Sequence, residues 1–98
     1  MDEENSNLSL LLHEKPVLTI LSLKGKEKYA SVLAKETNCT YTHTLKILSL
    51  FEKYGLISSE KDGRINKIKL TEKGEELAHD LEGIVRHLEH LVENSPEA

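Results

Sequence analysis

The chain has 98 residues, with 13 Lys or Arg and 17 Asp or Glu, and a formal net charge of −4. This length allows one small domain that buries only about 60–65% of its unfolded surface, so an oligomeric partner would add stability. One cysteine excludes an intramolecular disulfide, and no Cys/His cluster has zinc-site spacing. The chain has no apolar run of about 18 residues and no signal-peptide pattern, so we expect a cytoplasmic protein without a membrane span.

The charge is distributed unevenly along the chain. The stretch from Lys24 to Lys69 has ten basic and five acidic residues, whereas residues 1–23 carry −3 and residues 70–98 carry −6. Because a charged partner meets the local field and not the net charge, the basic middle favours a nucleic-acid partner. The alternative is that alternating Lys and Glu only solvate the surface.

The first third of the chain predicts two helices. Residues 1–7 are polar and acidic, and we expect them to be flexible. The leucine-rich stretch 8–23 contains Pro16, which fits either the first turn of a helix ending near Leu23 or a kink in a longer one. Its surplus of apolar residues is a candidate contact with another subunit. A second, shorter helix is predicted over residues 29–37, and Asn38-Cys39 separates it from the next one.

Residues 40–54 show a clear helical period. Their apolar side recurs at steps of three and four residues and comprises Tyr41, Thr44, Leu45, Leu48 and Phe51. Their polar side spans a stripe within about 40° of Thr42 on the helical wheel and comprises Thr42, Lys46, Ser49 and Lys53. Thr40 is the predicted N-cap, and Gly55 is the predicted left-handed residue that ends the helix.

A tight hairpin follows this helix. The stretches 56–61 and 64–70 are strand-like, and Asp62-Gly63 between them tolerates the positive φ angles of a type I′ turn. Two helices joined by a short turn and followed by a hairpin indicate a helix-turn-helix with a wing at about residues 57–70. A helix of this length can enter a major groove about 12 Å wide while the hairpin reaches the flanking backbone.

At these residues the chain resembles a known family. The stretch GLISSEKDGRINKIKLTEKGEEL is similar to the wing and following helix of winged helix-turn-helix regulators, especially the MarR-like and small archaeal one-domain groups. The resemblance covers roughly residues 17–91, and its strongest motifs are Phe51-Glu52-x-x-Gly55-Leu56-Ile57 and Leu70-Thr71-x-x-Gly74. It implies a mainly α fold with a small β-hairpin (α+β), and a DNA-binding transcription regulator that is usually a homodimer.

The candidate DNA contacts lie on the predicted recognition helix, about residues 40–54, and on the wing. Lysine can donate to guanine and threonine can meet a thymine methyl, whereas basic wing residues act mainly through phosphate or a narrow minor groove. Lys61 and Lys69 are weaker candidates, because hairpin lysines also protect exposed strand edges. Tyr41 is expected mainly to pack. The full set is Thr40, Tyr41, Thr42, His43, Lys46, Lys53, Arg64 and Lys67.

The last predicted helix, residues 72–93, carries a heptad pattern. It follows a winged-helix region of residues 8–71 and precedes a tail, 94–98, that we expect to be flexible. Apolar residues at alternating steps of four and three predict a dimer interface, and the N-terminal helix is a further candidate for it. Alternatively, this stripe packs only on the first helix of its own chain. The predicted interface residues are Leu77, Leu81, Ile84, Leu88 and Leu91.

Other chemistry has little support in the sequence. No nucleophile elbow or phosphate-binding loop is present, so we expect no enzyme and no cofactor. Cys39 fits an inert turn residue better than a redox sensor, and His79, His87 and His90 fit a solvated surface better than a metal site. No effector can be named. The competing function is a winged-helix adaptor that binds proteins and not DNA.

Overall fold

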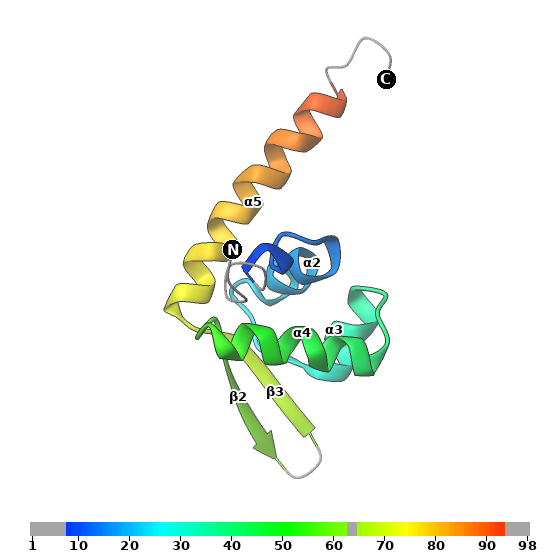
Figure 1. Ribbon diagram of the computed structural model, residues 1–98, viewed down its shortest axis with the longest axis vertical. Coiled ribbons are helices and arrows are strands. Elements are labelled where there is room, and N and C mark those ends of the chain that lie inside the picture. Colours follow the sequence, from blue (N-terminus) through cyan, green and yellow to red (C-terminus); the bar gives the residue numbers. More distant parts are fainter. Residues whose placement is uncertain (1–7, 63–64, 94–98) are drawn as a thin grey trace.

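The computed structural model describes residues 8–62 and 65–93 (Figure 1). The predicted flexible ends, residues 1–7 and 94–98, lie outside the described residues. Residues 8–10 are helical and lead by a turn into the first complete helix. The elements then follow in the order α2 (Glu14–Leu23), β1 (Lys28–Tyr29), α3 (Ala30–Glu36), α4 (Tyr41–Lys53), β2 (Ile57–Asp62), β3 (Ile65–Leu70) and α5 (Glu72–Glu93).

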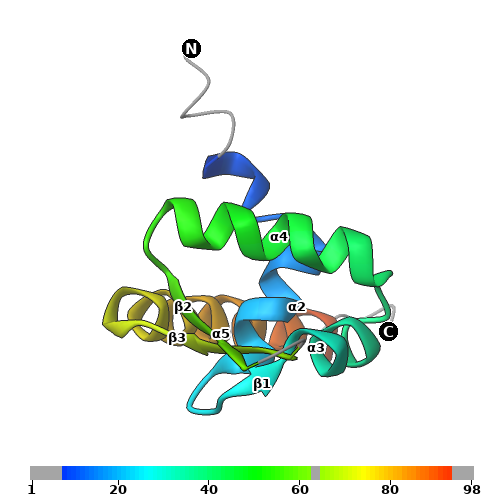
Figure 2. The same cartoon turned by 90° about the horizontal axis from the view of Figure 1, so that it is seen from below.

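One core joins these elements. Ile20 and Leu23 of α2, Leu33 of α3, Phe51 of α4 and Ile68 of β3 are essentially inaccessible to solvent. Seen from below, α3 and the strands lie on one side of α4, and the helical turn at residues 8–10 projects beyond α4 on the other side (Figure 2). One face of α4 therefore supports the core while the other remains available.

Pro16 is the third residue of α2, which settles the start of this helix. The helix begins at Glu14, with His13 at the N-cap. A proline within the first turn removes only an N–H that has no partner inside the helix, so it neither ends nor kinks the helix. The predicted end at Leu23 is confirmed.

The sheet differs from the prediction in two respects. It has three antiparallel strands in the order β1-β3-β2, and β1 includes Tyr29, which we expected inside a helix. In the hairpin, Asp62 pairs with Ile65, so Asp62 belongs to β2 and not to the turn. The rest of the predicted Asp62-Gly63 turn lies outside the described residues. The base of the hairpin fixes this register, because the Thr71 amide continues the ladder by donating to the Leu56 carbonyl at 2.9 Å.

Local hydrogen bonds close both ends of α4, at the residues predicted for them, and also close the end of α3. The Thr40 hydroxyl accepts a hydrogen bond from the His43 amide at 3.1 Å, confirming the N-cap of α4. Gly55 has φ +71°, and the Leu56 amide donates back to the Phe51 carbonyl. This is the Schellman pattern in which a left-handed residue satisfies the last carbonyls of a helix. Asn38, with φ +56°, ends α3 in the same way and opens the turn toward α4.

The two sequence motifs meet where α4, the hairpin and α5 join. The Thr71 hydroxyl donates to the Gly55 carbonyl at 2.6 Å and accepts from the Gly74 amide at 3.2 Å. A Cβ atom at Gly74 would clash with the Leu56 carbonyl oxygen. Glycine at this position therefore lets the first turn of α5 pack directly against the backbone that leaves α4.

The long helix α5 has a packed half and a projecting half (Figure 1). Ala78 and Leu81 are buried, and Leu77 packs against the core. The predicted dimer contact is therefore wrong for Leu81, because α2 and β3 of the same chain contact this half of the helix. Leu77, the other predicted interface residue in this half, is partly buried against the same core. Beyond residue 83 Val85 is half-buried, and the other large apolar side chains, Ile84, Leu88, Leu91 and Val92, are exposed.

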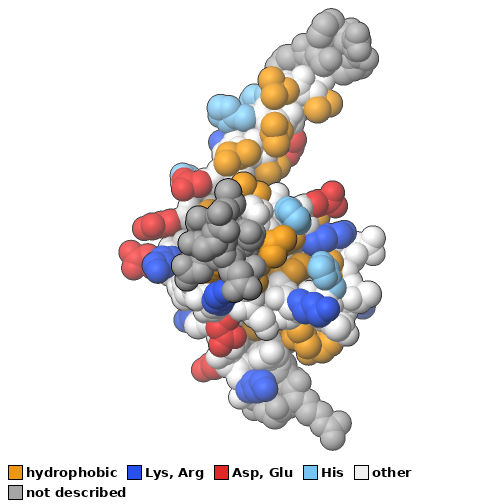
Figure 3. Space-filling model, viewed as in Figure 1, with side chains coloured by type: hydrophobic (Ala, Val, Ile, Leu, Met, Phe, Trp, Pro, Cys, Tyr) orange, Lys and Arg blue, Asp and Glu red, His pale blue; other side chains and the backbone are white. Residues whose placement is uncertain are grey.

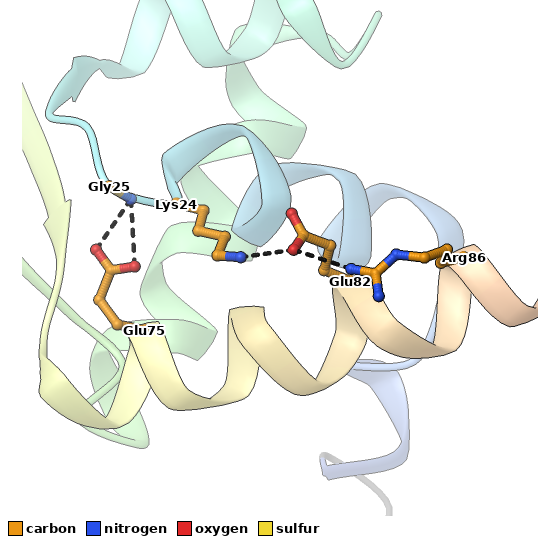
Figure 4. A network of polar contacts seen from close by, with 5 residues as sticks. All are labelled: Lys24, Gly25, Glu75, Glu82 and Arg86. Atoms are coloured by element: carbon orange, nitrogen blue, oxygen red, sulfur yellow. Dashed lines mark hydrogen bonds and ion pairs between the residues drawn. The ribbon is translucent and has the colours of Figure 1, made fainter.

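Polar contacts fix the packed half of α5 to the end of α2 (Figure 4). The Lys24 ammonium lies 2.7 Å from a Glu82 carboxylate oxygen, and Arg86 lies 3.4 Å from the same oxygen. The Gly25 amide donates to both Glu75 oxygens, at 3.0 and 3.2 Å. Lys24 holds the pKa of Glu82 below its ordinary value, first through the hydrogen bond and then through charge. These contacts help to set the direction in which α5 leaves the domain.

Candidate nucleic-acid interface

The polar stripe of α4 lies directly opposite its buried face. The buried side chains of this helix are Thr44, Ile47, Leu48 and Phe51. At about 100° per residue, the centre of this set lies about 170–190° from Thr42. The side chains that face away from the core are Thr42, Lys46, Ser49 and Lys53, and all four are exposed. The helix therefore presents small polar and basic groups, without a carboxylate, along its outermost line.

Two residues of α4 depart from the predicted pattern. Tyr41 is 47% exposed, although we expected its ring to pack with the apolar face. Ile47 is 5% exposed and takes the core position that the prediction omitted. The core lies about 190° from Thr42, which brings Ile47 into it and moves Tyr41 to its edge. Tyr41 is thus available, beside Thr40, at the end of α4 where the chain enters from the turn.

The two lysines of the stripe differ in their surroundings. Lys46 forms no ion pair with the described residues, and its side chain is exposed. The Lys53 ammonium lies 5.5 Å from the centre of the Tyr54 ring, a distance at which the ring attracts a cation. Lys46 is therefore the freer cation, whereas an aromatic ring orients Lys53. His43 is exposed on the flank of the helix that faces α2.

The hairpin places its lysines on two different faces. Strand alternation puts Lys61 on the same face as the buried Ile57, toward the helices, and puts Lys67 on the outer face. Lys67 lies 3.2 Å from a Glu27 carboxylate oxygen. The hydrogen bond and charge of Glu27 raise the pKa of Lys67 above its ordinary value. Lys67 is therefore already paired and turned away from α4, and the predicted Arg64 contact lies outside the described residues.

Lys61, a weaker candidate than Lys67 in the sequence, lies on the more favourable face of the wing. It shares the helix-facing side of the hairpin, whereas we preferred Lys67 because it flanks the turn. The alternation of side chains along β2 contains the necessary signal, since Ile57 and Lys61 are four residues apart and must share a face. Lys28 is a further basic residue near the sheet, but it lies 2.6 Å from Glu36 and is also paired.

Other kinds of site find little support in the described part of the chain. Within it, no group of three or more His, Cys, Asp or Glu side chains is placed to hold a metal ion. None of the helices of residues 8–62 and 65–93 is long and apolar enough to cross a membrane. Cys39 is half-buried in the turn between α3 and α4.

Three helices, a tight turn before the outermost helix and a hairpin beside it define a winged helix-turn-helix. The family model described as a winged helix DNA-binding domain matches residues 14–74, and the chain belongs to this family. The fold class and the resemblance inferred from the wing and the last helix are thereby confirmed.

Several proteins are similar over most of the chain. An uncharacterized protein of Archaeoglobus fulgidus is 27% identical over 92 residues, which cover 89% of this chain and 97% of that protein. The crystal structure of AF1382 from A. fulgidus superposes with a TM-score of 0.75 at 25% identity, covering 84% of this chain and 96% of that one. The MarR family transcriptional regulator SPO1453 from Silicibacter pomeroyi has a TM-score of 0.75 at 20% identity, covering 91% and 65% of the two chains, and shares the fold.

Proposed function

We propose that this protein is a homodimeric regulator of transcription that binds double-stranded DNA in the cytoplasm. In the proposal α4 enters the major groove, the wing follows the flanking backbone or minor groove, and no catalytic step is involved. The observation that carries the proposal is the exposed stripe of α4 opposite the core, which offers hydroxyl and ammonium groups and no carboxylate. Membership of a DNA-binding family supports the same conclusion.

The proposed contacts divide by chemical role. Thr42 and Lys46 face the base edges, because lysine can donate to guanine and the threonine methyl can meet thymine. Thr40, Tyr41 and His43 lie near the start of α4, where neighbouring phosphates are within reach. Lys53 lies at the other end of the stripe. On the wing we propose Lys61 in addition to Arg64, and we give Lys67 a smaller role because Glu27 already neutralises it.

Dimerisation would place two copies of α4 on one face of the duplex. A two-fold dimer reads half-sites that lie about 34–36 Å apart, or a multiple of that distance. The projecting half of α5 supports a dimer, because Ile84, Leu88, Leu91 and Val92 are each more than half exposed. Leucines of the N-terminal turn, Leu8 and Leu12, are exposed as well.

A protein-binding adaptor is the competing function. Such a role would favour an apolar outer face on α4, because the centres of protein interfaces are depleted of charge. The outer line of α4 instead consists of the hydroxyl side chains Thr42 and Ser49 and the lysines Lys46 and Lys53. The stripe therefore favours DNA.

The test is the salt dependence of DNA binding, followed by fluorescence anisotropy with a mixed-sequence duplex. Each lost phosphate contact reduces the slope of log K against log salt by about 0.9. We expect the variant Lys46→Gln, Lys61→Gln to bind more weakly and to lower this slope by about 1 to 2. The control is Lys26→Gln, which removes one charge from the exposed loop between α2 and β1 and should leave the slope unchanged.

Two results would count against this function. The first is an equal loss of DNA affinity per removed charge in the double variant and in Lys26→Gln. This result would show that only the overall charge matters and that the stripe has no special role. No binding by the native chain at about 20 mM salt, where nonspecific contacts are strongest, would exclude general DNA affinity. The adaptor function would then be the better account.

A further inference from the structure

The chain that precedes the described residues is acidic, and it joins the domain beside α4. Residues 1–7, the acidic segment, contain the three carboxylates of Asp2, Glu3 and Glu4 and no basic side chain. The described chain begins at residue 8, and the helical turn that follows projects beyond α4 (Figure 2). The acidic segment is therefore attached close to the helix that we propose for DNA.

Local contacts fix this point of attachment. The Leu11 amide donates to the Leu8 carbonyl at 3.1 Å, which closes a helical turn. The Leu11 side chain packs against the core of the domain. Leu10, in the same turn, lines a hollow that Lys46 of α4 also lines. The acidic segment thus starts from a fixed place at one flank of α4.

The flank of α4 that faces this attachment point is basic. His43 and Lys46 line the hollow and lie about 100° and 40° from Thr42 on the helical wheel. Neither side chain forms a hydrogen bond or an ion pair with the described part of the chain. The acidic Glu52 lies about 80° from Thr42 on the opposite flank. Figure 3 shows blue and pale-blue side chains close together over α2 and α4. The flank therefore offers bases without a partner to an anion.

The acidic segment is long enough to cover the outer line of α4. Its seven residues span up to about 23–25 Å when extended. The 13 residues of α4 form a helix about 20 Å long. A short tether gives a local concentration of about millimolar, so contacts that are weak between separate molecules are populated within one chain.

We propose that the acidic segment of residues 1–7 folds back onto the basic flank of α4 in its own chain and competes with DNA there. Its carboxylates lie against Lys46 and His43. The inference rests on the proposed function, because a carboxylate beside Lys46 affects DNA only if this lysine contacts DNA. DNA has to displace the acidic segment before it can bind, so the segment lowers the affinity of the protein for DNA.

The first measurement compares ¹⁵N spectra of the native full chain with those of Asp2→Asn, Glu3→Gln, Glu4→Gln, the segment variant, without DNA. We expect the amide shifts of residues 42–50 to differ between the two proteins at about 50 mM salt. The differences should vanish at about 0.5 M salt, where charges are screened beyond about 4 Å.

A matched control removes the same charge elsewhere. The variant Glu76→Gln, Asp80→Asn, Glu89→Gln changes three exposed side chains of α5 and should leave the shifts of α4 as they are in the native chain.

Fluorescence anisotropy with the mixed-sequence duplex then measures the effect on DNA. Exposed ion pairs are individually weak, so the segment variant should bind DNA about three- to tenfold more tightly than the native chain at about 50 mM salt. The gain in the α5 control should be clearly smaller. The segment variant should also show the steeper salt dependence, because DNA then displaces only counterions from the lysines and not the acidic segment.

Four results would overturn the proposed contact. The first is the absence of any shift difference in residues 42–50, and the second is a difference that persists at about 0.5 M salt. The third is a difference that fades on dilution, which would assign the contact to another copy of the chain. The fourth is an equal gain in DNA affinity in the segment variant and the α5 control. If neither the native chain nor the segment variant binds DNA while the shifts differ as expected, the regulator function fails and the contact within the chain stands.

Discussion

The two halves of α5 carry the same apolar spacing but have different surroundings. In the first half Ala78 and Leu81 are buried in the protomer, and the carboxylates of Glu75 and Glu82 bind the end of α2. In the second half the apolar side chains project beyond the domain (Figure 3). Ile84 and Leu88 are 53% and 55% exposed.

The difference in burial between the two halves shows which property of a helix a heptad pattern specifies. The pattern fixes which face of a helix is apolar, because side chains three and four residues apart share a face. It does not specify whether that face meets its own chain or a partner. The domain ends near residue 83, and the pattern continues past it. We therefore restrict the proposed dimer surface to the projecting half, with Val92 in addition to Ile84, Leu88 and Leu91.

The largest expected effect concerns the projecting half of α5, which we propose to be the dimer surface. The double variant Ile84→Ser, Leu88→Ser should dissociate the dimer while leaving the protomer folded. About half of each side chain remains to be buried, at about 1 kcal/mol each, and a symmetric dimer contains four copies. The dissociation constant should rise roughly a thousandfold, measured by sedimentation velocity over a concentration series.

Circular dichroism provides the control for this experiment. An unchanged helical spectrum would show that the two serines act on association and not on folding. A native chain that sediments as a monomer at all concentrations would refute the dimer surface, and the exposed stripe would then need another explanation.

Two glycines test the difference between the packed and the projecting half, because one lies in each half of α5. Gly74→Ala should destabilise the protein by about 2 kcal/mol, since the new Cβ atom meets the Leu56 carbonyl oxygen and the backbone must move. Gly83 has no atom within 4 Å of such a Cβ atom, and Gly83→Ala should stabilise the protein by about 1 kcal/mol through helix propensity. Urea unfolding of the two variants measures both values. Equal effects of the same sign would refute the assignment of a packed and a projecting half.

The sequence predicts the local elements of this fold well, because local signals determine them. Thr40 begins α4 and Gly55 follows its end as expected, and both hairpin strands are present. The strand β1 escaped prediction because it has two residues and exists only through its pairing with β3. The observed pairing of the hairpin differs from the prediction because the hydrogen bond between Thr71 and Leu56 fixes the base of the hairpin. This tertiary constraint overrides the preference of Asp62-Gly63 for a turn.

The candidate DNA surface was predictable where it depends on one helix, and less so where it depends on several elements. Helical periodicity alone places Thr42 and Lys46 on the outer line of α4. The pairing of Lys67 with Glu27 could not be predicted, because these residues are 40 positions apart and meet only across the sheet.

The smallest expected effect concerns the polar contacts that hold the packed half of α5. Lys24 lowers the pKa of Glu82 in the folded protein, so the ionised carboxylate stabilises the fold at neutral pH. This contribution is lost as the pH falls from the ordinary pKa of a glutamate through the lower pKa in the folded state. Glu82→Gln should therefore lower the melting temperature slightly at pH 7, and this effect should be smaller at about pH 3, below the ordinary pKa of a glutamate. Because the pair is largely solvated, about 0.5 M salt should also reduce the difference. Glu89→Gln, on the projecting half, is the matched control and should show neither dependence. A loss of the same size at both pH values would mean that Glu82 acts through packing and not through its charge.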